Sequence, residues 1–225
     1  MLGQYMSRSA ILLGLFALIG TGLVALVFTA TEERIAESER QFMLRNLHAV
    51  VKPELHDNDI FHDMITVIDP QRLGTKNPVP VFRARKNGEP VALAITPIAP
   101  DGYVGPIKIL VGITFDGTVL GVRVLSHRET PGLGDGIEEK RSDWVFGFNG
   151  RSLSNPGSKG WAVRRDGGQF DQFTGATITP RAIVKAVHKA LKFYALNRDQ
   201  LFQKTSLSPT EIHTEITHEE EATHE

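Results

Sequence analysis

The sequence predicts an α+β protein in which one membrane-spanning helix precedes a domain with a mainly antiparallel sheet and packed helices. Three observations support this. An uncharged apolar run occupies Ala10–Ala30. Runs of alternating apolar residues separated by short turns fill residues 79–126, and a long amphipathic segment, residues 181–197, comes after them. Strands joined in succession and followed by a helix are typical of the α+β class, because short turns connect antiparallel neighbours.

The apolar run is long enough to cross a bilayer. Its 21 residues span roughly 31 Å as a helix. The alternative is a cleaved signal peptide, but the run is long for one, and Phe28-Thr29-Ala30 is a poor cleavage site. We expect a stub at residues 1–9 on the cytoplasmic side and an uncleaved transmembrane helix at residues 10–30.

Residues 31–52 follow as a charged segment with a partial apolar stripe, and Pro53 ends it. This predicts a juxtamembrane helix that either docks a partner or, as we favour, packs on its own domain. The next segment, His56–Asp63, holds two His among acidic residues. Its spacing matches no compact ligand set, so a solvated loop is favoured over a metal site.

The strands are predicted from alternation and from turn residues between them. Asn87-Gly88 is a strong hairpin signal, and Asp116-Gly117 marks a second turn. Between Ile107 and Phe115 every second residue is apolar, which predicts a half-buried strand. The expected strands are Val79–Arg85, Val91–Ile98, Ile107–Phe115 and Thr118–Ser126.

Composition excludes several functions. The chain has 225 residues and a net charge of -1, and nothing in its composition suggests a nucleic-acid surface, which would need a basic face. It has no cysteine, so disulfides and thiolate-ligated iron–sulfur clusters are excluded. No Gly-x-Ser-x-Gly or zinc-protease motif supports a hydrolase. The tail, residues 205–225, is rich in Thr, Glu and His and is expected to be disordered, with His213, His218 and His224 as weak metal chelators.

Two short segments carry chemistry. The first is the loop His127–Asp135, where two glycines and a proline let the backbone approach a flat ligand closely. Its Gly132-Leu133-Gly134 is not a dinucleotide fingerprint, because Ile137 stands at the third glycine position. Shortly afterwards, Trp144, Phe146 and Phe148 either stack on a flat ring or pack in the core, and Ser152 is a further possible contact.

The second segment, Asp171–Pro180, is a turn that leads into a helix. Gly175 permits the bend, Thr179 is the expected N-cap and Pro180 the expected first helical residue. A helix from Arg181 to about Asn197 follows. The hydroxyls of Thr174, Thr177 and Thr179 therefore precede a helix N-terminus, which predicts either a phosphate site or an ordinary Thr-capped helix.

Together the two segments resemble the signatures of FMN-binding domains in the RnfG/NqrC family. Asp-x-x-Thr-Gly-Ala-Thr, ending at Thr177, is similar to the flavinylation motif, and His-x-Glu-Thr-Pro-Gly-Leu-Gly precedes it by about forty residues. The resemblance implies that Thr177 carries FMN through a phosphoester bond, in an FMN-binding domain at residues 53–204. It also implies that Thr179 and the helix N-terminus meet the phosphate. The other implied cofactor-binding residues are Asp171, Thr174, Gly175, Ala176, His127, Glu129, Thr130, Pro131, Gly132, Leu133 and Gly134.

The resemblance is greatest to the G subunits of Rnf-type ion-translocating electron transport complexes. It implies a membrane-anchored flavoprotein that relays electrons among other membrane subunits and is not a complete enzyme alone. It also implies a separate Mg²⁺-dependent flavin transferase as a maturation partner, and a periplasmic domain on the bacterial inner membrane. The alternatives are an assembly module without a redox cofactor, or the usually longer C subunit of the Na⁺-pumping quinone reductase. Thr174 stands where many relatives have Ser, and the acidic tail is a departure from the family.

Overall fold

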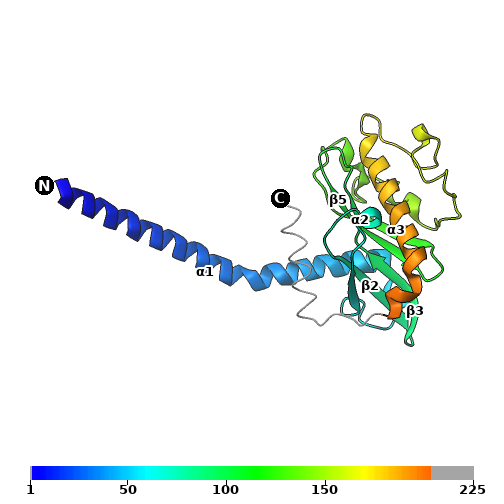
Figure 1. Ribbon diagram of the computed structural model, residues 1–225, viewed down its shortest axis with the longest axis horizontal. Coiled ribbons are helices and arrows are strands. Elements are labelled where there is room, and N and C mark those ends of the chain that lie inside the picture. Colours follow the sequence, from blue (N-terminus) through cyan, green and yellow to red (C-terminus); the bar gives the residue numbers. More distant parts are fainter. Residues whose placement is uncertain (1, 204–225) are drawn as a thin grey trace. The chain divides into compact units, whose positions relative to one another are not determined.

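The computed structural model describes residues 2–203, so the predicted disorder of the tail lies outside the described residues. The chain divides into two compact units, residues 1–43 and residues 44–225. A single uninterrupted helix, α1 (Leu2–Val50), contains both the expected membrane span and the helix expected after it (Figure 1). Within α1, the stretch Ala10–Val50 contains an 18-residue window with a mean hydropathy of 2.6, so the helix is long and apolar enough to cross a membrane. The large apolar side chains from Ile11 to Phe28 are all at least half exposed, as contact with lipid requires.

The second unit is built on one six-stranded antiparallel sheet, which confirms the predicted α+β class (Figure 1). The strand order is β1-β2-β3-β5-β4, and β6 pairs with the other edge of β5. The strands are β1 (Met64–Val67), β2 (Val79–Lys86), β3 (Glu89–Ile95), β4 (Ile98–Ala99), β5 (Ile107–Thr114) and β6 (Val119–Ser126). The helices after α1 are η1 (Pro53–Leu55), α2 (Pro70–Leu73), η2 (Gly134–Ile137), η3 (Asp143–Phe148), η4 (Arg164–Asp166) and α3 (Ile178–Gln203).

The predicted hairpin is present, and its turn shows why. Asn87 and Gly88 both have positive φ, 53° and 81°, which a two-residue type I′ turn requires. The strand expected at Val91–Ile98 is interrupted, so that β3 ends at Ile95 and β4 is a separate short strand. Pro97 lies in the gap, and a proline has no N–H to continue the ladder.

Both faces of the sheet are covered. On one face, Ile109 and Val111 of β5 are fully buried in a cluster with residues of α3. On the other face, Val50 at the end of α1 packs against Gly112 and Gly121, which face each other across β5 and β6. A Cβ on Gly112 would lie 2.9 Å from the Val50 carbonyl oxygen, so this close approach depends on glycine.

This packing corrects one prediction. The half-buried strand expected at Ile107–Phe115 is in fact buried on both faces, and Leu110 on the second face has no exposed surface. Alternation in the sequence shows which face holds the larger apolar residues. It does not show that the last turns of a distant helix cover the opposite face. Leu47, Val50 and Val51 belong to this second layer and are buried as well.

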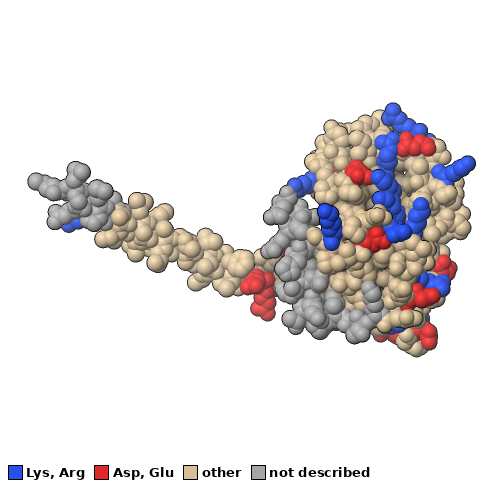
Figure 2. All heavy atoms as spheres, in the orientation of Figure 1, with Lys and Arg blue, Asp and Glu red and all other residues tan. Residues whose placement is uncertain are grey.

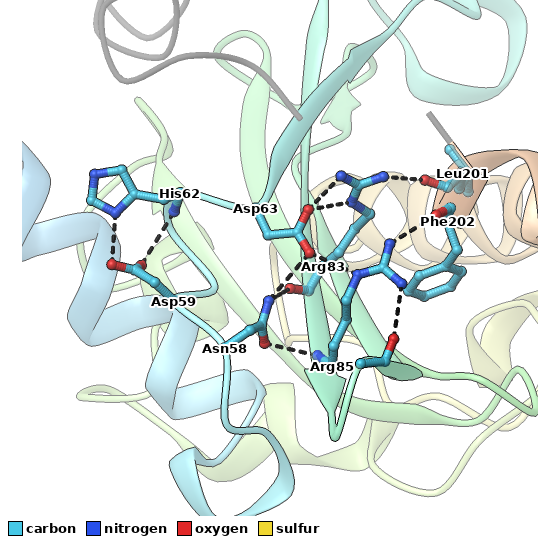
Figure 3. Close-up of polar contacts among 9 residues, drawn as sticks. Asn58, Asp59, His62, Asp63, Arg83, Arg85, Leu201 and Phe202 are labelled. Carbon is cyan, nitrogen blue, oxygen red and sulfur yellow. Dashed lines mark hydrogen bonds and ion pairs between the residues drawn. The ribbon is translucent and has the colours of Figure 1, made fainter. Parts of the chain in front are cut away.

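A buried ion-pair cluster holds the C-terminal end of α3 to the sheet (Figure 3). Arg83 and Arg85 of β2 both donate to the Asp63 carboxylate, each Nε at 2.8 Å. Arg83 also donates to the Leu201 carbonyl oxygen at 3.0 Å, and Arg85 donates to that of Phe202 at 2.7 Å. Two cations thus satisfy the last carbonyls of the helix at the negative end of its dipole.

The same cluster shows that the expected solvated loop at His56–Asp63 is only partly solvated. Asp59 and His62 form an exposed pair, with the Asp59 side chain 59% exposed. Asp63 is 15% exposed, and Ile60 and Phe61 between them are buried. The loop therefore presents Asp57 and Asp59 to water and the Asp63 carboxylate to the interior, where it compensates Arg83, a side chain only 2% exposed.

Candidate functional site

The loop after β6 forms a tight turn that shapes one wall of the site. The N–H groups of Leu133 and Gly134 both donate to the Thr130 carbonyl oxygen, at 3.1 and 2.9 Å. Gly132 has φ of 78° at the third position of this turn and Pro131 occupies the second. That is the arrangement of a type II turn, which needs positive φ at its third residue. The predicted role of the glycine and proline in bending the backbone is confirmed.

A second turn of the same kind forms the opposite wall. The Ala176 N–H donates to the Phe173 carbonyl oxygen at 3.2 Å, and Gly175 has φ of 81°. Helix α3 then begins at Ile178, and its first backbone bond runs from the Arg181 N–H to the Thr177 carbonyl oxygen, 3.3 Å. The residue whose carbonyl accepts this bond is the N-cap, so Thr177 occupies that position.

The predicted N-cap and first helical residue are therefore wrong by two positions. Thr179 and Pro180 lie inside the first turn of α3. A proline is tolerated there, because the first N–H groups of a helix have no partner within the helix. Its presence also removes one of the donors that a helix N-terminus would otherwise offer to an anion.

The hydroxyl of Thr177 has no hydrogen-bond partner within residues 2–203. An N-cap threonine usually accepts a hydrogen bond from a backbone N–H one turn into the helix. Among residues 2–203, however, no hydrogen bond involves the Thr177 side chain, which is half-buried at the start of α3. A hydroxyl in this position is held in place by the backbone, and its oxygen remains available.

A buried carboxylate joins the two segments beneath this position. The Thr179 hydroxyl donates to Oε2 of Glu129, and the Val104 N–H donates to Oε1 at 3.0 Å. Glu129 is 4% exposed and Thr179 is 1% exposed. A carboxylate is favoured next to a helix N-terminus by the dipole, so Glu129 occupies the inner side of the place predicted for a phosphate. The Thr179 hydroxyl thus faces the protein interior.

Gly134 makes this junction possible. A Cβ at this position would lie 2.8 Å from the Glu129 Cβ and 3.1 Å from the Thr179 hydroxyl oxygen. His127 contacts the backbone of Glu129. Its Nδ1 accepts the Glu129 N–H at 3.0 Å, and its Nε2 donates to Glu138 at 2.8 Å. His127 therefore fixes the loop through hydrogen bonds and does not line the cavity described next.

The two turns enclose a cavity of about 140 Å³. It contains eight of the predicted cofactor-binding residues, which come from segments more than forty residues apart. Tyr103 and Ile178 also line it, and no sequence pattern around Asp101-Gly102-Tyr103 predicted the former. The lining residues are Tyr103, Glu129, Thr130, Leu133, Gly134, Gly175, Ala176, Thr177, Ile178 and Thr179.

The remaining predicted residues lie outside the lining. His127, Pro131 and Gly132 belong to the supporting loop, and Thr174 is exposed at the second turn. Asp171 is 66% exposed and pairs with Arg164 at 2.9 Å. Its carbonyl oxygen accepts the indole N–H of Trp144 at 2.7 Å, so Asp171 is fixed by a backbone contact.

Of the three aromatic residues expected to stack on a ring or to form core, Phe148 and Trp144 pack in the core and Phe146 is exposed. Phe148 is fully buried and stacks on Phe170 at 4.7 Å between ring centroids. Trp144 packs edge-on against Phe173 at 5.4 Å, and the Phe173 ring lies where a Cβ on Gly136 would meet it at 3.1 Å. This cluster holds the two turns together. Phe146 lies outside the cavity, beneath the Arg123 guanidinium. Ser152 lines a different hollow, of about 740 Å³, at the C-terminal half of α3.

The cavity is small and its rim is apolar. Cofactor sites are typically about 300–1,000 Å³, so 140 Å³ suits a phosphate and part of a ribityl chain. The rim residues Tyr103, Leu133 and Ile178 are 67%, 48% and 43% exposed. Exposed apolar side chains grouped around a hollow that also contains three threonines and a carboxylate fit a ligand that has a flat apolar part and a polar end.

Comparison with known proteins agrees with this geometry. The FMN-binding domain family matches residues 102–192, which include both turns and the start of α3. The RnfG N-terminal region family matches residues 1–50, the whole of α1. The chain therefore contains an FMN-binding domain, and the predicted cofactor, FMN, is the one its family binds.

Curated relatives match over nearly their whole length. A protein of Pseudomonas aeruginosa, named as the G subunit of the ion-translocating oxidoreductase complex, is 52% identical over 196 residues, covering 87% of this chain and 92% of that protein. Proteins of the same name from Shewanella loihica and Vibrio cholerae are 50% and 48% identical, covering 93% and 92% of their own lengths. With an N-terminal region, an FMN-binding domain and full-length relatives in agreement, the chain belongs to the family of G subunits of ion-translocating oxidoreductase complexes.

Proposed function

We propose that this protein is a membrane-anchored flavoprotein subunit that relays electrons through FMN attached to Thr177, within an ion-translocating oxidoreductase complex. The observation that carries the proposal is the hydroxyl of Thr177, without a hydrogen-bond partner within residues 2–203, at the start of α3 beside a cavity built from both motifs. FMN supplies the electron chemistry when bound. The chain's own residues hold, orient and partly shield it, and the protein alone completes no catalytic cycle.

The geometry supports covalent attachment over simple binding. A cavity of about 140 Å³ buries too little of a cofactor of this size to retain it by contact alone. A phosphoester to an N-cap hydroxyl removes the need for a high affinity. The two N–H groups of Ile178 and Thr179, at the positive end of the helix dipole, then face the anionic end.

The acceptor hydroxyl needs an outside catalyst. Activation of a threonine hydroxyl requires a base within hydrogen-bond reach. Among residues 2–203, Thr177 has no such partner, and both carboxylate oxygens of Glu129, the acidic residue of the cavity lining, already accept hydrogen bonds. Thr177 is therefore the substrate of a separate flavin transferase, and it is modified after the domain has folded.

The proposed location follows from α1. This helix anchors the chain in the bacterial inner membrane as a single pass, with residues 1–9 on the cytoplasmic side and the domain on the periplasmic side. Basic residues flank the apolar run on both sides and do not set the orientation, so the proposal rests on the resemblance to the G subunits. Protease added to intact spheroplasts should digest the domain, whereas inverted vesicles should protect it.

The test of the flavin proposal is covalent flavin on a denaturing gel. The full chain is produced together with a flavin transferase, and its band is examined for flavin fluorescence beside Thr177→Ala and Thr174→Ala variants. Thr174 is the other threonine of the motif and lies three residues away in the exposed turn, outside the cavity lining, so the two variants together show which hydroxyl carries the flavin. Fluorescence in the parent and in Thr174→Ala, but not in Thr177→Ala, is the expected result.

The rival function is an assembly module that holds other subunits without a cofactor. A dark parent band, with a known flavinylated protein fluorescing in the same cells, would refute the electron-relay proposal and leave the assembly module. Loss of fluorescence in Thr174→Ala, with fluorescence kept in Thr177→Ala, would show that the flavin is attached to Thr174. The C subunit of the Na⁺-pumping quinone reductase is not favoured, since the curated relatives that cover this chain are named as G subunits of the ion-translocating complex.

A further inference from the structure

A band of basic side chains follows the exposed face of α3. Arg181, Lys185, Lys189 and Lys192 are spaced four, four and three residues apart, so they lie on one side of the helix. Figure 2 shows Lys and Arg side chains gathered along this helix. The band begins four residues after Thr177, and we refer to these four residues as the basic band.

Half of the basic band is neutralised within the domain and half is not. Arg181 donates to Asp166 at 2.6 Å and Lys185 pairs with Asp101. These hydrogen bonds lower the pKa of both carboxyl groups, which therefore stay ionised. Neither Lys189 nor Lys192 makes a hydrogen bond or ion pair with any other residue between 2 and 203.

The charge of the chain is divided unevenly along its length. Residues 44–203 contain 21 Lys and Arg against 16 Asp and Glu. Residues 204–225 contain one Lys against six Glu. The net charge of -1 for the whole chain is therefore the result of a basic domain and an acidic tail whose charges nearly cancel. The tail lies outside the described residues, and its charge is read from the sequence.

We infer that the acidic tail, residues 204–225, docks on the basic band of α3. The tail continues directly from Gln203, the last residue of the helix that carries the band. From there, Lys192 and Arg181 are roughly 17 and 33 Å away along the helix. Twenty-two residues reach up to about 70 Å when extended. Attachment to the same helix gives the tail an effective concentration in the millimolar range, which favours many weak charge contacts.

The inference goes beyond the proposed function and does not depend on flavin attachment. Its consequence is that the tail competes with other anionic partners for the surface that begins one turn from Thr177. An acidic protein or an anionic lipid surface that approaches the basic band would have to displace the tail first. The basic band alone could bind the tail, an acidic protein or an anionic lipid surface. We favour the tail because it is acidic and because it begins at the end of the helix that carries the band.

Spin-label distances in the full chain test the inference. The protein has no cysteine, so Ala195→Cys on the exposed side of α3 and Ala222→Cys in the tail give two unique sites. In an uncharged detergent at about 0.01 M salt we expect a population of short distances. This population should fall several-fold at about 1 M salt, where the Debye length shortens from about 30 Å to about 3 Å.

Two charge-reversed variants identify the docking surface. Lys189→Glu with Lys192→Glu should remove the short distances. Lys140→Glu with Lys159→Glu, the same change of charge at exposed lysines outside α3, should keep them. All four substitutions are at the surface, and tryptophan fluorescence during thermal unfolding checks that each variant folds.

Three results would overturn the inference. The short distances could be absent at low salt, or they could survive reversal of the basic band. Equal loss in both charge-reversed variants would show a general attraction to a basic domain and not docking on α3. Loss of the short distances in anionic lipid nanodiscs, with retention in zwitterionic ones, would instead support the inference, because an anionic surface is expected to displace the docked tail.

Discussion

Replacing Asp63 by asparagine should destabilise the domain severely, although the two side chains have the same shape. The Asp63 carboxylate accepts hydrogen bonds from both Arg83 and Arg85, and a further one from the Asn58 amide at 3.2 Å. In Asp63→Asn one oxygen becomes an NH₂ donor that faces a guanidinium, and the negative charge is lost. Arg83, 2% exposed, then loses the Asp63 carboxylate that compensates its buried charge.

The size of the effect follows from this burial. Removing one partner of a buried ion pair costs about 3–5 kcal/mol, because the other charge stays buried. Arg85 and Asp63 are 22% and 15% exposed, and the carbonyl oxygens of Leu201 and Phe202 still accept from the arginines. We therefore expect the free energy of unfolding to fall by an amount near the lower end of this range, about 3 kcal/mol. A typical domain has a total stability of about 5–15 kcal/mol.

Urea unfolding measures this loss, with Trp144 and Trp161 as fluorescent probes within the domain. At a slope of about 2 kcal/mol per molar urea, the midpoint should fall by about 1.5 M. Asp59→Asn is the matched control, because Asp59 lies four residues earlier in the same loop and its ion pair is with the exposed His62 (Figure 3). The asparagine oxygen can still accept the N–H groups of Phe61 and His62 that Asp59 Oδ1 accepts. It should change stability by less than about 1 kcal/mol. A loss below 1 kcal/mol in Asp63→Asn, or equal losses in both variants, would refute the reasoning.

Three further predictions concern other parts of the domain. Gly112→Ala should lower stability by about 1–3 kcal/mol, because its Cβ would lie 2.9 Å from the Val50 carbonyl oxygen; Gly147→Ala, with open space around it, is the control in the same urea assay. Thr179→Val should cost about 1–3 kcal/mol by leaving a Glu129 oxygen unsatisfied, yet the folded variant should still accept flavin at Thr177 on a denaturing gel. Burial beside Trp161, with the nearby charge of Lys192, lowers the pKa of His188 to about 4. The unfolded chain binds that proton from about pH 6.5 downward, so His188 contributes stability above pH 6.5 that is lost as the pH falls toward 4. After allowance for partial exposure this loss is about 1–2 kcal/mol, and His188→Gln should lack it in unfolding curves collected between pH 7 and pH 4.

The turns of the fold could be predicted from the sequence, whereas contacts between distant residues could not. Asn87-Gly88, Pro131-Gly132 and Gly175 stand at turns whose backbone angles only such residues adopt readily, so these positions were predictable. The start of α3 was misplaced because a proline is tolerated anywhere in the first turn of a helix, and Pro180 is not at the first position.

The missed features share a different cause. Strand β1, Met64–Val67, is only four residues long and follows an acidic loop, so no alternation could be recognised. The interior role of Asp63 depends on Arg83, twenty residues away, and on a helix end more than a hundred residues away. Tyr103 reaches the cavity because Val104 and Gly102 lie against Glu129. Each of these contacts is decided by tertiary structure and leaves no local pattern.

The two ends of α3 are tied to parts of the chain that are made long before it. Thr179 bonds to Glu129 across fifty residues, and Arg83 bonds to Leu201 across 118 residues. Contacts of such sequence separation form late, because the loop between their ends must first be closed. During synthesis the sheet therefore emerges without its covering helix, and the domain completes only after residue 203 has left the ribosome. The contacts that position Thr177 therefore cannot form before α3 has been made, so a modifying enzyme that acts on the folded domain would act after residue 203 has left the ribosome.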